Sequence, residues 1–408
     1  MLPKYCLVTA VVNRVSIMAH AEETLRNLLN TELDTRGYKP RDVAIKAIST
    51  NGANYTSQLF LVDVTSPGRD DLHLFAKVAI INDALRDRMC ADWLFDTEKF
   101  TYTKLAKVYD EMQNKFQVPA EDRLIFPKFY AVNAEQGKET VIMENLVASG
   151  YKSFNRFDSM DWEHACAGVK NLALFHALSF GYAKEYPEEF EKLSANMKYM
   201  LGKAPEDIEA MKPLWMKLIN SALAVIKDDQ KERVAKYLSS CPELCTYNIP
   251  KSRAVISHGD YRLSNLLFKK QGTKVDAISV DYQTVHAGCP ATDLIYFIFM
   301  GSDEEFRAKN YERLLDYYYS TLSKAMERLS VDPVEAYPRE MFDSDMKETM
   351  PYAVLIGATI LPMVTVEAEL APNIQDDDIS KFVSMSPNEL FAKRFSGIVN
   401  DCLRWNVI

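Results

Sequence analysis

The sequence predicts a two-lobed α+β fold, with a small strand-rich N-terminal lobe that contains one main helix and a larger, mostly helical C-terminal lobe. Short apolar runs bounded by Gly, Pro and Asp, which are typical of strands, lie in the first third of the chain. From Trp162 onward, apolar residues recur at helical intervals instead. We expect the lobes to cover 1–144 and 145–408, with 144–150 as the crossing segment.

Turn residues order the first lobe. The segment 65–71, which contains Pro67 and Gly68, predicts one hairpin, and 135–138 predicts another. The chain between them has the period of an amphipathic helix. The predicted elements are strands over 58–64 and 72–81, a helix over 83–112, and strands over 126–132 and 140–143.

In the second lobe, a predicted hairpin over 254–280 with its turn at Gly272 interrupts a series of helical patterns. The predicted helices cover 162–180, 206–239, 304–328 and 346–361. Aromatic residues in 296–299 and 317–319 are candidates for lining a substrate pocket, although residues at this spacing also form helix cores.

The run from His258 to Asn265, with the pattern His-x-Asp-x-x-x-x-Asn, opens this hairpin and predicts phosphoryl transfer. Asp260 is the candidate base that orients and deprotonates an acceptor hydroxyl. Asn265 and Asp281 lie symmetrically about the turn, so antiparallel pairing brings them to the same open end. Two such oxygen ligands suit Mg²⁺, which takes substrate phosphates and water for the rest. The alternative is an ordinary surface hairpin with a polar loop.

Two further residues, Asp293 and His258, are candidates for supporting this loop. Asp293 either caps the helix that follows it or accepts backbone hydrogen bonds around His258. His258 is expected to orient the loop backbone. His176, on an apolar helix, is expected to be a hydrogen-bonded core residue. Whether Asp293 or Gln283 touches metal or only supports the loop stays open.

A lysine lies inside an apolar strand of the first lobe, where it needs a partner. We expect Lys77 to pair with Glu98, which shares a helix face with Leu94 and Tyr102, and to be aimed at the α and β phosphates of ATP. Asp96 is the competing acid. The alternative is a lysine that reaches solvent from an edge strand.

The remaining nucleotide contacts are predicted from two short segments. The loop 51–57, with Asn54, Tyr55, Thr56 and Ser57, contains small hydroxyls and one glycine and is a candidate phosphate lid. The segment Met143, Glu144, Asn145 and Leu146, between the lobes, is a candidate adenine site, and a plain buried strand is the alternative.

Composition excludes several classes of protein. A formal net charge of -9 disfavours nucleic acid as the main partner. Seven cysteines without regular spacing are typical of reduced thiols, and no stretch reaches the roughly 20 apolar residues of a membrane span. We expect a cytoplasmic protein, either a monomer or a weak dimer. Because Cys289 and Pro290 follow Asp281 so soon, there is no room for a peptide-docking segment, and a protein substrate is disfavoured.

The sequence resembles the insect ecdysteroid kinase-like family over nearly its whole length. The motifs that carry the resemblance are Asn54-Tyr55-Thr56-Ser57, Phe75-Ala76-Lys77, Glu98 with Tyr102, Glu144-Asn145-Leu146 before Gly150-Tyr151, Phe175-His176-Ala177-Leu178-Ser179, His258-Gly259-Asp260 with Asn265, and Asp281-Tyr282-Gln283. The chain departs from the family pattern at Asn145, where Asp is commoner, and at Tyr261 in the loop.

The family is similar to choline kinases and aminoglycoside phosphotransferases, so the resemblance implies a bilobal protein-kinase-like fold. It also implies ATP- and Mg²⁺-dependent phosphorylation of a small-molecule hydroxyl, which for the namesake members is the 22-hydroxyl of an ecdysteroid. Plant or xenobiotic hydroxyl compounds and choline-like acceptors remain alternatives. A catalytically silent steroid binder is disfavoured because Lys77, Asp260, Asn265 and Asp281 are all present.

Overall fold

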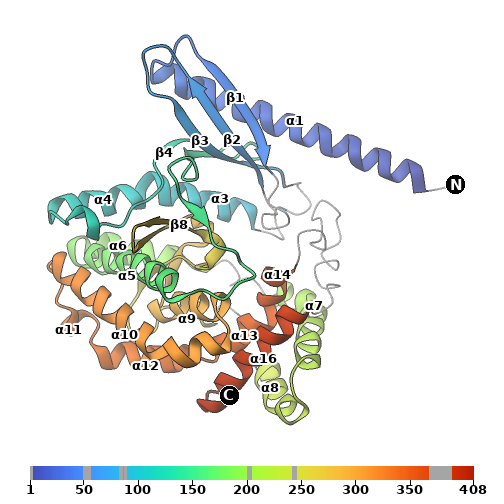
Figure 1. The fold of residues 1–408 in the computed structure, drawn as a ribbon, viewed down its shortest axis with the longest axis vertical. Helices are drawn as coiled ribbons and strands as arrows, with labels where there is room; N and C mark the ends of the chain where they lie inside the picture. Colours follow the sequence, from blue (N-terminus) through green and yellow to red (C-terminus); the bar gives the residue numbers. More distant parts are fainter. Residues whose placement is uncertain are drawn as a thin grey trace. The chain divides into compact units, whose positions relative to one another are not determined.

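A computed structural model of the protein describes residues 3–48, 57–81, 86, 90–199, 205–240, 246–366 and 388–408 (Figure 1). It has the predicted α+β composition, with an antiparallel strand-rich N-terminal part and a larger helical part. By backbone contacts the described residues form two compact units, the first within 3–99 and 127–150 and the second within 100–126, 151–366 and 388–408. The predicted lobe boundary after residue 144 stays a prediction.

The first unit is a five-stranded antiparallel sheet with the strand order β1-β2-β3-β5-β4. Both predicted hairpins are present, whereas α1 and β1 were not predicted. The elements are α1 (Pro3–Thr35), β1 (Asp42–Ile48), β2 (Ser57–Thr65), β3 (Leu72–Ala79), α3 (Ala91–Phe100), β4 (Phe129–Asn133) and β5 (Thr140–Glu144).

Helix α1 packs on this sheet through a row of apolar side chains. Leu25, Leu29 and Leu33 recur at four-residue spacing on one helix face, and each is at most 1% exposed. They belong to one core cluster with Phe60 of β2 and Leu74 of β3. This contact fixes the face of the sheet that is buried, since side chains alternate along each strand.

The helix predicted over 83–112 is found as three consecutive elements. Among its first eight residues the structure describes only Arg86 and Cys90, and the backbone of Cys90 has a positive φ of 49°, after which α3 begins. A π-helical turn over Thr101–Leu105 follows α3, and α4 covers Ala106–Lys115. The extra residue in each π turn shifts the helical face, which the simple period did not predict.

The second unit is mainly helical, as predicted. Its helices are α5 (Trp162–Glu185), α6 (Pro187–Asn196), α7 (Pro205–Ala224), α8 (Asp228–Ser240), α9 (Pro290–Gly301), α10 (Glu304–Arg328), α11 (Pro333–Ala336), α12 (Arg339–Thr349), α13 (Tyr352–Thr359), α14 (Leu361–Thr365) and α16 (Glu389–Arg404). The helices predicted over 206–239 and 346–361 were each too long. The second is broken at Pro351, which cannot donate a helical hydrogen bond.

Side-chain caps fix the starts of the long helices. Asp161, Asp303 and Asn388 accept the hydrogen bonds that begin α5, α10 and α16, respectively. No described helix has both the length and the continuous apolar character that crossing a membrane requires.

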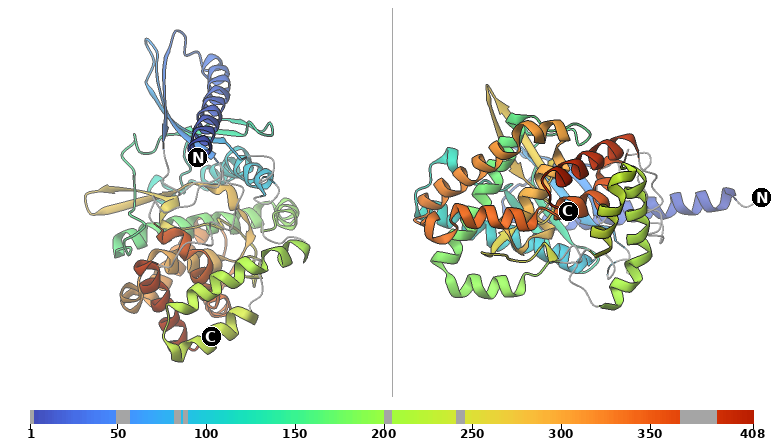
Figure 2. Two further views of the ribbon diagram at one scale, coloured as in Figure 1. Left: turned by 90° about the vertical axis from the view of Figure 1, so that its right-hand side faces the viewer. Right: turned by 90° about the horizontal axis from the view of Figure 1, so that it is seen from below.

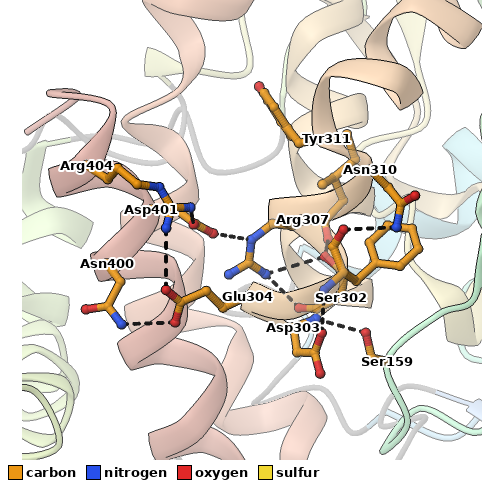
Figure 3. A network of polar contacts seen from close by, with 12 residues as sticks. Ser159, Ser302, Asp303, Glu304, Arg307, Asn310, Tyr311, Asn400, Asp401 and Arg404 are labelled. Carbon is orange, nitrogen blue, oxygen red and sulfur yellow. Dashed lines mark hydrogen bonds and ion pairs between the residues drawn. The ribbon is translucent and has the colours of Figure 1, made fainter.

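The C-terminal helix α16 is joined to the start of α10 by a buried ion pair (Figure 3). Arg307 donates from Nε to Asp401 at 2.6 Å and from Nη1 to the Ser302 carbonyl at 2.7 Å. Both charged side chains have no exposed surface. Arg404, at the end of α16, also pairs with Asp401.

Strands of the second unit form two small sheets. They are β6 (Lys152–Ser153), β7 (Val255–Ser257), β8 (Leu266–Gln271), β9 (Lys274–Ser279) and β10 (His286–Gly288). The β8–β9 ribbon projects from the surrounding helices (Figure 2). Strand β7 pairs with β10.

Candidate functional site

The predicted hairpin is present, with Leu266 of β8 opposite Ser279 of β9. At its open end, the Val280 N–H donates to the Asn265 carbonyl at 3.0 Å. Asp281 therefore comes one residue after the partner of Asn265, as the symmetry of the sequence predicted. The turn Leu263–Asn265 leads directly into β8, so the loop that carries Asp260 and the hairpin form one continuous structure.

Asp260 accepts hydrogen bonds from three side chains. Tyr296 of α9 donates to Oδ1 at 2.8 Å, and Asn265 donates to Oδ2 at 2.9 Å. Arg262 forms an ion pair in which its Nε lies 2.9 Å from Oδ1. The Asp260 side chain is nevertheless 19% exposed. The carboxylate is thus held in place and still open to a substrate.

The donor end of the Asn265 amide is used within the loop. Its Nδ2 donates to the Asp260 carboxylate and to the Asp260 carbonyl, each at 2.9 Å. The amide oxygen is therefore the end that remains for a cation. Asp281 has a left-handed backbone with φ of 66° and begins the short turn Tyr282–Thr284. Amide and carboxylate oxygens are the donors that Mg²⁺ prefers, so these two residues fit the ion.

Tyr282 anchors the chain next to Asp281. Its ring is fully buried, and the rings of Tyr102 and Phe175 lie 5.7 Å and 5.9 Å away, centroid to centroid. The neighbouring His258 ring lies 4.9 Å from it. Several residues of the family motifs thus form one aromatic cluster in the second unit, and their role here is packing.

Asp293 supports the loop in the second of the two ways considered from the sequence. Its carboxylate accepts the backbone N–H of His258 at 2.7 Å and that of Gly259 at 2.9 Å. The helix that it belongs to, α9, begins at Pro290, and its N-cap residue Cys289 makes no side-chain capping hydrogen bond. His176, fully buried, lies 3.2 Å from the same carboxylate through Nε2 and 2.7 Å from the Tyr318 hydroxyl through Nδ1.

The surroundings of Asp293 and His258 shift the pKa values of both groups. Burial alone would raise the pKa of Asp293, but the hydrogen bond from His176 and the nearby histidines outweigh it and lower the pKa below the usual Asp value. Burial lowers the pKa of His258. We infer an ionised Asp293 that accepts hydrogen bonds from the loop backbone.

Glycine is required at position 259 because the backbone at Thr284 lies too close for a side chain there. Its φ is +83°, and an added Cβ would lie 2.4 Å from the carbonyl oxygen of Thr284. The Thr284 hydroxyl donates in turn to the His258 carbonyl at 2.8 Å. A side chain at position 259 would therefore separate the loop from the segment that follows Asp281.

Replacing Asp293 by Asn should destabilise the second unit by about 1–3 kcal/mol, because the amide nitrogen would face backbone donors. Since the pKa of Asp293 is lowered in the folded protein, its contribution is present above the ordinary Asp pKa and disappears as pH falls through the folded value. In urea unfolding, the difference in free energy of unfolding between wild type and variant should be largest at pH 7 and should decrease below about pH 4. Asp316→Asn, at a 66% exposed carboxylate, is the control. A gap independent of pH would contradict this explanation.

In the first unit, Lys77 and Glu98 form the predicted ion pair. The Lys77 Nζ lies 2.9 Å from Glu98 Oε2, and their side chains are 5% and 1% exposed. Lys77 lies on β3, which is paired with both β2 and β5, so the alternative of an edge-strand lysine is wrong. The competing acid Asp96 is 74% exposed and lies 3.8 Å from Lys99.

The other predicted nucleotide residues are described only in part. Asn54, Tyr55 and Thr56 of the predicted phosphate lid lie outside the described residues, and Ser57 is the buried first residue of β2. At the predicted adenine segment, Met143 and Leu146 are each 5% exposed.

The backbone at this segment is partly used. The N–H of Glu144 donates to the Lys128 carbonyl at 2.8 Å, and the N–H of Asn145 donates to the His73 carbonyl at 2.9 Å. Leu146 comes next, and among the described residues no backbone acceptor pairs with its N–H. Of the predicted adenine donors, Leu146 is therefore the one left for a ligand.

Sequence reasoning missed two residues that touch Asp260, namely Tyr296 and Arg262. Arg262 had a usable signal, because it is the charged residue inside the loop motif. Tyr296 had been a candidate for the substrate pocket only as part of an aromatic run, of which Phe297 and Phe299 prove to be fully buried core. Tyr318, in the other run, contacts His176.

The comparisons with known proteins are as follows. A family model described as the ecdysteroid kinase-like family matches residues 51–331. The search of curated proteins found no match. Among solved structures, the chain is similar to a microcompartment-associated aminopropanol kinase, with 13% identity, a TM-score of 0.44, and coverage of 93% of this chain and 98% of that one. It is also similar to an aminoglycoside-3'-phosphotransferase of type VIII, with 14% identity, a TM-score of 0.35, and coverage of 76% and 99%.

Proposed function

This chain belongs to the ecdysteroid kinase-like family and is a small-molecule kinase, and we propose that it transfers the γ-phosphoryl group of ATP to the 22-hydroxyl of an ecdysteroid. The observation that carries the transfer chemistry is the geometry of Asp260, a fixed and partly exposed carboxylate next to Asn265. The family match supports the choice of an ecdysteroid as the proposed acceptor.

Asp260 acts as the base in this proposal. Its carboxylate orients the acceptor hydroxyl and takes its proton as the oxygen attacks the γ-phosphorus. Tyr296 and Asn265 hold the two carboxylate oxygens, so little reorganisation is needed when the acceptor binds.

Asn265 and Asp281 are the proposed protein ligands of Mg²⁺. The ion would neutralise charge on the phosphate groups. Asn265 is kept in orientation by the hydrogen bonds of its amide nitrogen to Asp260. Asp281 is kept in place by the buried Tyr282, which follows it.

Lys77, Glu98 and Leu146 are proposed to bind the nucleotide. Glu98 holds the buried Lys77 ammonium through the ion pair at 2.9 Å, so that Lys77 can bind phosphate oxygens in a fixed position. The Leu146 N–H is proposed to donate to the adenine ring, with Met143 and the chain of Glu144 and Asn145 forming the wall of the site. Asn54, Tyr55, Thr56 and Ser57 are proposed to cover the phosphates.

Replacing Glu98 by Gln should lower kcat/KM for ATP by about 10- to 100-fold, the range for loss of one hydrogen bond to a charged group. Lys77 would remain buried without a matching charge and would bind phosphate in the wrong position. Asp96→Asn, at an exposed position of the same helix, is the matched control and should change kcat/KM less than 2-fold. Normal ATP turnover by Glu98→Gln combined with a defect in Asp96→Asn would reverse the assignment.

The acceptor is tested by ATP consumption with ecdysone, 20-hydroxyecdysone and choline in parallel. We expect turnover with the two steroids and a product phosphorylated at the 22-hydroxyl, as located by NMR. Turnover with choline alone would contradict the steroid assignment while keeping the kinase chemistry. Tight steroid binding without turnover would instead favour a silent binder. A xenobiotic kinase would use neither steroid but would use hydroxylated plant compounds.

A cytoplasmic location is part of the proposal and is tested by cell fractionation.

A further inference from the structure

Arg262 is a charged residue of the catalytic loop to which the proposed mechanism gives no role. It comes two residues after Asp260, and its Nε alone contacts the Asp260 carboxylate. Nη1 and Nη2 have no hydrogen-bond partner in the part of the chain that the structure describes. The side chain is 21% exposed. Two guanidinium nitrogens next to the proposed base are therefore available to a ligand.

Buried arginines of the same unit use one or both of these nitrogens for structure, and Nη2 of Arg307 has no hydrogen-bond partner among the described residues. Arg307 donates from Nη1 to the Ser302 carbonyl at 2.7 Å. Arg394 donates from Nη2 to the Asp158 carbonyl at 2.7 Å and from Nη1 to the Met300 carbonyl at 3.4 Å. Arg262 differs because neither its Nη1 nor its Nη2 donates a hydrogen bond to a described residue.

Asp260 does not need Arg262 to stay in position. Its Oδ1 is bound by the Tyr296 hydroxyl and its Oδ2 by the Asn265 amide. A positive charge that served only to hold this carboxylate would therefore be superfluous. The charge is better explained by a substrate group that brings its own negative charge.

The surroundings of Arg262 keep it charged. Burial lowers its pKa, but the negative charges of Asp260 and Asp281 outweigh burial and raise the pKa above the usual Arg value. Arg262 therefore interacts electrostatically with both the proposed base and a proposed metal ligand. A phosphoryl group in transfer has to pass between such groups, and a planar guanidinium matches its oxygens with two parallel hydrogen bonds.

We propose that Arg262 binds the γ-phosphoryl group of ATP through Nη1 and Nη2 during its transfer, an inference that rests on the proposed kinase function. In the step, the acceptor oxygen forms a bond to the γ-phosphorus and its proton goes to Asp260. The bond from phosphorus to the bridging oxygen breaks, and its electron pair leaves with ADP. Arg262 stabilises the negative charge on the non-bridging oxygens and is not itself changed.

The test compares nucleotides with and without a γ-phosphoryl group, so no acceptor is needed. Isothermal titration with Mg²⁺ and either ADP or AMP-PNP gives two dissociation constants for each variant. Arg262→Gln should weaken AMP-PNP binding by about 10- to 100-fold and change ADP binding less than 2-fold. Arg262→Lys, which keeps the charge but loses the fork, should show a smaller loss. Arg253→Gln, at an exposed arginine just before the loop, is the control and should change neither constant.

Asp260→Asn separates the proposal from a purely structural ion pair. Removing this carboxylate frees Arg262 and removes a negative charge, so AMP-PNP should bind as tightly as in wild type or more tightly. Equal weakening by Asp260→Asn and Arg262→Gln would overturn the proposal, as would an unchanged ratio of the two constants in Arg262→Gln. Failure of wild type to bind either nucleotide would overturn the kinase function together with this inference. Nucleotide binding without transfer to any tested acceptor would overturn only the acceptor assignment.

Discussion

Asp260→Asn should reduce kcat by about 10²- to 10⁴-fold, the usual contribution of a general base. The amide can still occupy the same space and accept the Tyr296 hydrogen bond, but it cannot take the acceptor proton. ATP affinity should be kept, because Asp260 is not proposed to bind the nucleotide and the hydrogen bond from the Asn265 amide to the backbone carbonyl of residue 260 remains to orient the metal ligand. The measurement is a steady-state assay with whichever acceptor the parallel ATP-consumption assays show to be phosphorylated, together with calorimetric titration of AMP-PNP.

The control for this variant is Asp276→Asn. Asp276 lies on β9, outside the catalytic loop, and its carboxylate is 2.8 Å from the Lys274 ammonium. It should leave kcat within 2-fold of wild type. If Asp260→Asn kept normal turnover, Asp260 would not be the base and the transfer would have to proceed without proton removal by this group.

Asp401→Asn should lower the free energy of unfolding by about 3–5 kcal/mol, the range for removing one member of a buried ion pair. Arg307 would keep its charge without a counter-charge in a site that has no exposed surface. The expected loss is large because water cannot reach the guanidinium to replace the carboxylate. Equilibrium unfolding in urea, followed by tryptophan fluorescence, measures it; Trp405 lies next to this network.

Two further variants identify the cause. Arg404→Gln removes the other partner of Asp401, but that side chain is 49% exposed and should cost at most about 1 kcal/mol. The double variant Arg307→Met with Asp401→Leu leaves no buried charge and should recover part of the loss. A loss in Arg404→Gln as large as that in Asp401→Asn would show that the exposed pair, and not the buried one, holds α16.

The parts of the fold that the sequence predicted are those governed by local pattern. The β8–β9 hairpin followed from Gly272 and its flanking apolar runs, and the pairing of Lys77 with Glu98 followed from an isolated charge in an apolar strand. Long helices were found, but the helix predicted over 346–361 was too long because Pro351 interrupts it, and the helix predicted over 83–112 contains a π turn that was not predicted. Such breaks depend on packing as well as on local propensity.

What the sequence did not predict depends on long-range contacts. Tyr296 is 36 residues from Asp260 along the chain, and only the packing of α9 brings its hydroxyl to the carboxylate. Strand β1 alternates weakly and pairs only with β2, so its pattern resembled a polar connection. Helix α1 was not predicted, although Leu25, Leu29 and Leu33 recur on one face at the four-residue spacing of a helix.

The left-handed backbone of Asp281 limits which residues can occupy this proposed metal-binding position. Asn, Asp and Gly adopt this conformation at little cost, whereas other residues lose roughly 1–2 kcal/mol. A relative that lost phosphoryl transfer by mutation would therefore most easily retain the turn with Gly or Asn at this position. A bulkier residue at position 281 would remove the oxygen ligand and strain the chain before Tyr282 at the same time. The positive φ at position 281 thus links the conformational stability of the turn to the proposed metal-binding role of its side chain.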